Sequence, residues 1–125
     1  MTTFHAIVWI DHTQAHVLMF DREHVEAQRI KARSHVTPKH GKLGADKDFF
    51  QQIAHSLDGV TEVLITGPAN AKHEFREFCK HNAHAVDKAV VDVVNSDHPS
   101  DAQLVAMARQ YFVKFDQQAA DPSLR

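Results

Sequence analysis

Three short segments near the start of the chain have the composition of β-strands. Residues 4–10, 15–20 and 25–30 are rich in β-branched and aromatic side chains, and short polar stretches such as Asp11-His12-Thr13-Gln14 separate them. Strands joined by such tight polar breaks form antiparallel hairpins. The sequence therefore predicts that the fold begins with a meander of three antiparallel strands.

Beyond residue 45 the apolar residues alternate between helical spacing and short buried runs. Helices are predicted to start at Asp46, after Asn70, and at Ser96 or Ser100. Strands are predicted over 62–66 and over 89–94, with Val86 leading into the second. The order βββ-α-β-α-β-α predicts an α/β protein with a mixed sheet and helices on its faces, as in the ribonuclease H-like fold. At 125 residues the chain suits one domain, predicted over 1–116 with a frayed tail over 117–125.

Positive charge is concentrated in one stretch of a nearly neutral chain. The net charge is −2, yet the segment from Ala27 to Ala45 contains five Lys or Arg residues and no acid. Residues 32–45 lack a hydrophobic period and contain Pro38, Gly41 and Gly44, so we expect a mobile basic loop. Flexible cations suit phosphates, because each neutralised phosphate releases a counterion without any reading of sequence.

Two further patterns extend this basic surface. Arg29 and Lys31 alternate on a predicted strand and should point to one face. Lys72, Arg76 and Lys80 stand at helical spacing and predict a second basic stripe. The candidate RNA-binding residues are therefore Arg29, Lys31, Arg33, Lys39, His40, Lys42, Lys72, Arg76 and Lys80.

Several classes of chemistry lack their usual motifs. The single cysteine, Cys79, excludes an internal disulfide and reads as a buried thiol on an apolar helical face. The chain has no phosphate-binding glycine loop, nucleophile elbow or His-Glu-x-x-His motif. It also has no secretory signal and no apolar run of roughly 20 residues. We expect no catalytic residue, no metal and no cofactor, and a cytoplasmic protein.

Two alternatives follow from other features. Ribonuclease H-like nucleases hold two Mg²⁺ ions with clustered acids, and Asp11 with Asp92 could supply part of such a cluster. An interaction module is the other alternative, in which an exposed sheet edge or the last helix docks a protein or a second copy. The sequence leaves the oligomeric state open.

Two motifs resemble one protein family. Residues 37–45, Thr-Pro-Lys-His-Gly-Lys-Leu-Gly-Ala, resemble the Lys-His-Gly-Arg-Gly-Gly-Gln loop in the middle domain of eukaryotic and archaeal class 1 peptide chain release factors. Residues 64–72 resemble the strand-to-helix turn of that domain, which Pelota shares. The resemblance covers roughly residues 4–115 and is that of a stand-alone bacterial member of the translational machinery. It implies a ribonuclease H-like fold without nuclease activity.

The loop departs from the family at the residues that carry release activity. In the release factors the Gly-Gly-Gln tripeptide enters the peptidyl transferase centre and promotes hydrolysis of peptidyl-tRNA. Here Leu43 replaces the first glycine, Gly44 matches the second, and Ala45 replaces the glutamine. The resemblance therefore implies a non-catalytic protein that binds RNA or the ribosome in rescue, dormancy or stress. Its expected partners are the ribosome, ribosomal RNA or tRNA, and no membrane.

Overall fold

The computed structural model describes residues 5–21, 23–32 and 38–120, with side chains of the last range described over 47–114. The elements in chain order are β1 (His5–Ile10), β2 (Gln14–Phe20), β3 (Val25–Lys31), α1 (Pro38–Ser56), β4 (Glu62–Gly67), α2 (Ala71–Asn82), α3 (His84–Ala89), β5 (Val90–Asn95) and α4 (Asp101–Ala120). The predicted α/β class is confirmed.

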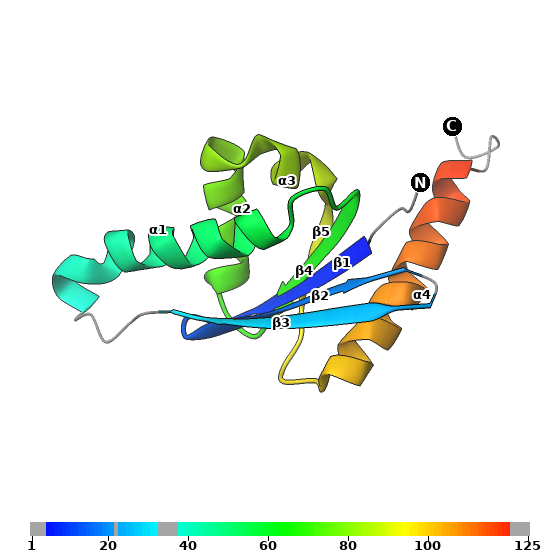
Figure 1. Ribbon diagram of the computed structural model, residues 1–125, viewed down its shortest axis with the longest axis horizontal. Coiled ribbons are helices and arrows are strands. Elements are labelled where there is room, and N and C mark those ends of the chain that lie inside the picture. Colours follow the sequence, from blue (N-terminus) through cyan, green and yellow to red (C-terminus); the bar gives the residue numbers. More distant parts are fainter. Residues whose placement is uncertain (1–4, 22, 33–37, 121–125) are drawn as a thin grey trace.

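One mixed five-stranded sheet organises the molecule (Figure 1). Its strand order is β3-β2-β1-β4-β5. The hairpins β1–β2 and β2–β3 are antiparallel, as predicted, whereas β4 runs parallel to β1 and β5 runs parallel to β4. The meander and the later strand–helix units therefore meet at β1, which lies in the centre of the sheet.

The sheet separates two apolar cores. Alternate residues of β1 point to opposite faces, so Val8 belongs to the cluster under α1, α2 and α3, whereas Trp9 belongs to the cluster under α4. Five of the six β1 residues are buried, because both faces of the strand are covered. Burial of this continuous apolar strand is the main anchor of the fold.

Helix α1 begins earlier than the sequence predicts. Residues 38–45 were expected in a loop that ends at Asp46, but they form the first turns of α1. Pro38 occupies the first helical position, where its fixed φ and missing N–H are tolerated. Gly41 and Gly44 each weaken a helix by only about 1 kcal/mol, so they do not prevent it. Residues 33–37 of the predicted loop lie outside the described residues.

The remaining helices refine the predicted order. Val86 lies in the short helix α3 and not in a strand, so β5 starts at Val90 and two helices separate it from β4. Ser100, one of the two predicted starts, precedes α4. The Ser100 hydroxyl accepts a hydrogen bond from the Gln103 N–H at 3.2 Å, and the Gln103 amide oxygen accepts one from the Ser100 N–H at 2.9 Å. Helix α4 continues to Ala120, past the predicted domain end at residue 116.

Gly67 permits the close approach of β4 to β1 at the end of the sheet. A β-carbon at this position would lie 2.1 Å from the carbonyl oxygen of Ile10. Backbone atoms cannot yield as a flexible side chain can. The glycine of the strand-to-helix turn at 67–70 is therefore required by the sheet itself.

We predict that Gly67→Ala lowers the free energy of unfolding by about 3 kcal/mol or more, because it forces two central strands apart. Gly59→Ala is the matched control. Nothing lies within 4 Å of a β-carbon there, and its φ of +85° costs about 1–2 kcal/mol. Urea unfolding followed by circular dichroism measures both, and equal losses would contradict the steric explanation.

Candidate nucleic-acid interface

Helix α1 carries part of the predicted basic surface away from the body of the molecule. Its C-terminal half is anchored by buried residues, namely Phe49, Phe50, Ile53, Ala54 and Leu57. Its N-terminal half projects beyond the end of the sheet in Figure 1. Lys39, His40 and Lys42 lie on this projecting half, and their side chains are outside the described residues, as is the whole of Arg33. The projecting half of α1 is residues 38–46.

The structure adds one cation that the sequence reasoning missed. Lys47 follows the projecting half directly, and its side chain is exposed on α1. We overlooked it because Asp46 ends the acid-free segment that defined the basic stretch. The helix continues past Asp46, and this continuity is the signal that would have added Lys47 to the candidate RNA-binding residues.

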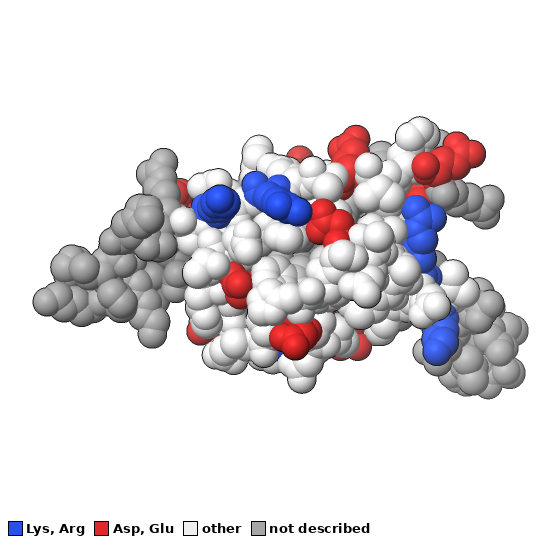
Figure 2. Space-filling view, turned by 90° about the horizontal axis from the view of Figure 1, so that it is seen from below, with Lys and Arg blue, Asp and Glu red and all other residues white. Residues whose placement is uncertain are grey.

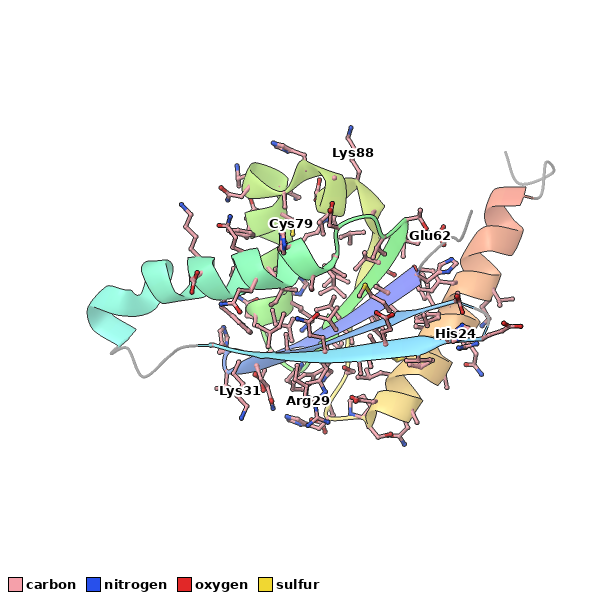
Figure 3. All side chains as sticks on the ribbon, in the orientation of Figure 1. His24, Arg29, Lys31, Glu62, Cys79 and Lys88 are labelled. Atoms are coloured by element: carbon pink, nitrogen blue, oxygen red, sulfur yellow. The ribbon has the colours of Figure 1, made fainter. Side chains whose placement is uncertain are left out.

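Arg29 and Lys31 lie on one face of β3, as the strand alternation predicts. Both are exposed, and they pair with His16 and Gln14 of β2. Figure 3 shows the two side chains below the sheet, on the side opposite α1 and α2. The Arg29 guanidinium lies 3.7 Å from a carboxylate oxygen of Asp101, so part of its charge is neutralised within the protein.

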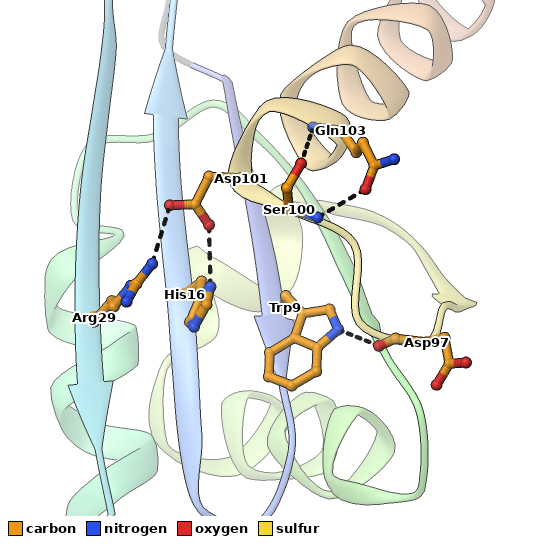
Figure 4. Close-up of polar contacts among 7 residues, drawn as sticks. All are labelled: Trp9, His16, Arg29, Asp97, Ser100, Asp101 and Gln103. Atoms are coloured by element: carbon orange, nitrogen blue, oxygen red, sulfur yellow. Dashed lines mark hydrogen bonds and ion pairs between the residues drawn. The ribbon is translucent and has the colours of Figure 1, made fainter.

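A polar cluster holds the start of α4 against this part of the sheet (Figure 4). The Trp9 indole N–H donates to the carbonyl oxygen of Asp97 at 2.8 Å. Asp101 uses its other carboxylate oxygen to contact Nδ1 of His16 at 3.1 Å. The Trp9 ring also lies 5.4 Å from the His16 ring and 5.0 Å from the His98 ring, measured between centroids. These contacts fix Asp101 beside Arg29.

One of the three residues of the second predicted basic stripe is not on the surface. Lys72 is only 3% exposed, and its ammonium donates to the carbonyl oxygen of Ala69. It therefore faces the protein and is not available to a surface ligand. Arg76 donates to Asp87 at 2.8 Å, and Lys80 lies 3.8 Å from Glu77. Helical spacing places these three residues in one row, but the first of them is buried.

Exposed cations in the described residues are dispersed and not gathered into one patch. Figure 2 shows blue groups in a pair near one end of the molecule and in a row near the other, with red groups between them. A broad electrostatic surface on the body is therefore not available. The basic segment centred on α1 and the end of β3 contains the longest acid-free stretch of the sequence.

The two acids of the nuclease alternative are kept apart by the sheet. Asp11 follows β1, whereas Asp92 lies in β5 opposite Leu64 of the intervening β4. Leu64 pairs in turn with Ile7 of β1, which is four residues before Asp11. Four residues along a strand and two strand spacings across the sheet separate the backbones of the two acids by about 15 Å. Both also have local partners. Such an arrangement does not assemble a two-metal site.

Asp92 is engaged by helix α4. One of its carboxylate oxygens accepts a hydrogen bond from the Tyr111 hydroxyl at 2.9 Å, and the other accepts one from the Val93 N–H at 2.8 Å. Burial raises the pKa of Tyr111, and the hydrogen bond and negative charge of Asp92 raise it further. The pair joins α4 to β5 and is a structural contact.

Asp11 organises the first hairpin turn. Its carboxylate accepts hydrogen bonds from the N–H groups of Thr13 and Gln14 at 2.8 and 2.9 Å, and from the Thr13 hydroxyl. Partial burial acts to raise the pKa of Asp11, but these hydrogen bonds together outweigh burial and hold the pKa below its ordinary value. Asp11 is therefore a turn residue whose charged form is favoured.

We predict that Asp11→Ala lowers the free energy of unfolding by about 1 kcal/mol at pH 7. Because the pKa is lowered in the folded state, this stabilisation is complete above the unfolded value near 3.8 and disappears as pH falls through the folded value. Urea unfolding should show a smaller difference in unfolding free energy between the unmodified chain and Asp11→Ala below pH 3 than at pH 7. Asp11→Asn, which keeps an acceptor oxygen but no charge, is the control and should show a smaller loss.

Cys79 lies on α2, has no exposed surface and packs into the apolar core that this helix covers. Burial raises the pKa of its thiol to about 12, with Asp87 adding to the shift and Arg76 opposing it. A thiol that stays protonated and covered is not a nucleophile. The predicted structural role of this cysteine is therefore confirmed by its position.

We predict that Cys79 of the native protein does not react with an aromatic disulfide reagent at pH 8 except through unfolding. In denaturant, the same thiol should react completely within the mixing time of a spectrophotometric assay. Rapid stoichiometric reaction of the native chain would show that the thiol is accessible and would contradict the assignment.

Other ligand sites are sparse in the part of the chain that the structure describes. No group of three or more His, Cys, Asp or Glu residues in it could hold a metal ion. A groove of about 830 Å³ lies between the C-terminal half of α1 and the α2–α3 junction, and no Lys or Arg contributes to its lining. None of the helices described there combines the length and apolar character of a bilayer-spanning segment.

Comparison with known proteins finds similarity in structure and not in sequence. No protein-family model matches the chain, and no curated protein matches its sequence. Among solved structures, Archaeoglobus fulgidus Pelota aligns with 95% of this chain at a TM-score of 0.65 and 16% identity. The archaeal translation termination factor aRF1 aligns with 94% at 0.62 and 16% identity. Saccharomyces cerevisiae Dom34 aligns with 94% at 0.54 and 12% identity.

The aligned part is a fraction of each of these proteins. The chain spans 37% of the Pelota structure, 41% of aRF1 and 32% of Dom34. It thus has the size of one section of a larger factor. The structure confirms at the level of fold the resemblance that the two sequence motifs predict: the chain has the fold of a part of the Pelota and class 1 release factor proteins.

Proposed function

We propose that the chain is a non-catalytic RNA- or ribosome-binding protein of translation, acting in rescue, dormancy or stress. The observation that carries the proposal is the position of the basic motif. Residues 38–45 of the motif that resembles the release-factor loop lie on the projecting half of α1, in a fold shared with aRF1, a translation termination factor. A projecting cationic segment can reach a phosphate backbone that the body does not touch.

The structural neighbours support the same class of function. Dom34 is a translation termination-like factor involved in RNA quality control pathways that interacts with Hbs1. For the present chain we propose the ribosome, ribosomal RNA or tRNA as the partner and the cytoplasm as its location. The strand order β3-β2-β1-β4-β5 also supports the ribonuclease H-like description of the fold.

The binding surface is proposed from the residues that remain available. Arg33, Lys39, His40 and Lys42 provide its centre, and Lys47, Arg29 and Lys31 extend it along α1 and β3. Lys72 is buried, and Arg76 is 32% exposed and held by Asp87, whereas Arg29 stays 64% exposed beside Asp101. Without Lys72 and Arg76, Lys80 no longer belongs to a basic stripe on α2. We therefore restrict the proposed interface to the α1 and β3 side of the molecule.

The first test is cosedimentation with ribosomes over a salt series. Lys39→Ala combined with Lys42→Ala should weaken binding and reduce the slope of log K against log salt by about 1.5, because two phosphate contacts are lost. Lys88→Ala combined with Lys114→Ala is the matched control. Both residues are exposed, and the variant loses the same charge from α3 and α4.

The two variants separate local contact from net charge. Equal weakening by both would show that binding depends only on overall charge, and no weakening by the first would overturn the proposed interface. Adding Arg33→Ala to the first variant should weaken binding further. Cleavage of the RNA during the assay would instead favour a nuclease.

We further propose that the chain does not hydrolyse peptidyl-tRNA. Leu43 and Ala45 stand where the release-factor pattern has glycine and glutamine, and an alanine methyl group cannot orient water by hydrogen bonding. Ribosomes carrying labelled peptidyl-tRNA should bind the protein without releasing peptide. Release above the background of a protein-free control would contradict this statement.

A further inference from the structure

Among the residues that the structure describes, no segment pairs with the outer side of strand β3, which is an edge of the sheet. It pairs with β2 on one side only, and all of its residues except Ile30 are exposed. The opposite edge, β5, differs because Val90–Val94 are all half-buried. Long exposed edge strands are templates for pairing with another chain, since their outward N–H and C=O groups have no partner in the sheet. β3 contains no proline and no bulge in its described pairing.

The hydrogen-bond pattern shows which β3 residues point outward. Thr13 and Ala32 face each other and are joined by a backbone hydrogen bond at 2.8 Å, as are Asp21 and His24 at 3.0 Å. In an antiparallel pair such bonded positions alternate with unbonded ones. The even-numbered residues of β3 are therefore bonded to β2, and Val25, Ala27, Arg29 and Lys31 direct their N–H and C=O groups away from the sheet.

The approach to this edge is open on the α4 side. Helix α4 packs on β1 and β2, and Asp101 at its first turn is the residue that reaches β3, through Arg29. Val25 is 46% exposed as a result. Helix α1 contacts β3 from the other face, where Ile30 is buried, whereas Val25–Arg29 are exposed. A second strand in the plane of the sheet would lie beside this exposed part of β3.

We propose that β3 pairs antiparallel with β3 of a second copy, about a twofold axis at Gln28, and joins the two sheets into one. The pairing uses the strand that also carries Arg29 and Lys31 of the proposed interface, but its tests measure oligomeric state and do not require ribosome binding. In this register Val25 faces Lys31 of the second copy and Ala27 faces its Arg29, and each facing pair exchanges two backbone hydrogen bonds. Every outward residue of the strand then has a partner.

Charge selects this register over its neighbours. An axis at Arg29 would place two guanidinium groups opposite each other, which is unfavourable. An axis at Ala27 would leave Lys31 beyond the end of the paired strand. With the axis at Gln28, Glu26 faces Ile30 of the second copy and the two Gln28 amides face each other, where an amide can both donate and accept. The strand can therefore pair with itself with no like charges directly opposite and with every outward backbone group bonded, which favours a second copy as the occupant.

Crosslinking gives the first test. Gln28 would face its own copy in a pair without backbone bonds, with about 4.5 Å between Cα atoms, within the range that a disulfide spans. Gln28→Cys should therefore form a disulfide-linked dimer under mild oxidation. Glu26→Cys is the control, because the two copies of position 26 would lie about 13 Å apart and should not crosslink. Equal crosslinking of both variants, or of neither, would overturn the register.

Sedimentation equilibrium of the unmodified chain gives the second test. The apparent mass should rise toward twice the monomer value with concentration. Ala27→Pro removes an outward N–H that β2 does not use, so the fold should persist while dimer formation is lost. Ala27→Ser keeps the N–H and should still dimerise. An unmodified chain that stays monomeric in the millimolar range, or an Ala27→Pro dimer of unchanged affinity, would overturn the proposal; circular dichroism verifies folding.

Discussion

The rest of the structure depends on the complete burial of β1. This strand pairs antiparallel with β2 and parallel with β4, and its two faces supply residues to both apolar cores. Because both neighbours and both faces are occupied, β1 fixes where the hairpins end and where the strand–helix units begin. The close contact between Gly67 and Ile10 belongs to the same constraint, since β4 must reach β1 before the chain turns into α2.

Much of this fold can be predicted from local sequence because its strands are short, β-branched and separated by polar turns. The positions of β1, β2, β3 and β4 follow from that pattern within a residue or two. The helical conformation of residues 38–45 does not follow from the pattern, because Gly41 and Gly44 have low helix propensity. The free-energy cost of these glycines is small compared with the stability gained by continuing the helix. The apolar pattern places Val86 in a strand, because a short apolar run does not distinguish a buried helix from a strand.

The candidate site shows the same division between local and tertiary information. A period of two places Arg29 and Lys31 on one face of β3 without knowledge of the fold. Helical spacing puts Lys72 in line with Arg76 and Lys80, but only the packing of α2 on the sheet reveals that Lys72 is buried. Likewise, the separation of Asp11 from Asp92 depends on strand register, which the sequence does not encode in any short motif.

The early start of α1 changes what its cations can do. A helix advances about 1.5 Å per residue, so the ten residues from Pro38 to Lys47 form a stiff spacer about 14 Å long. A helix fixes how far its residues lie from the body, whereas a slack chain would let them sample a broad volume. The described part that projects from the molecule is therefore only one helix wide.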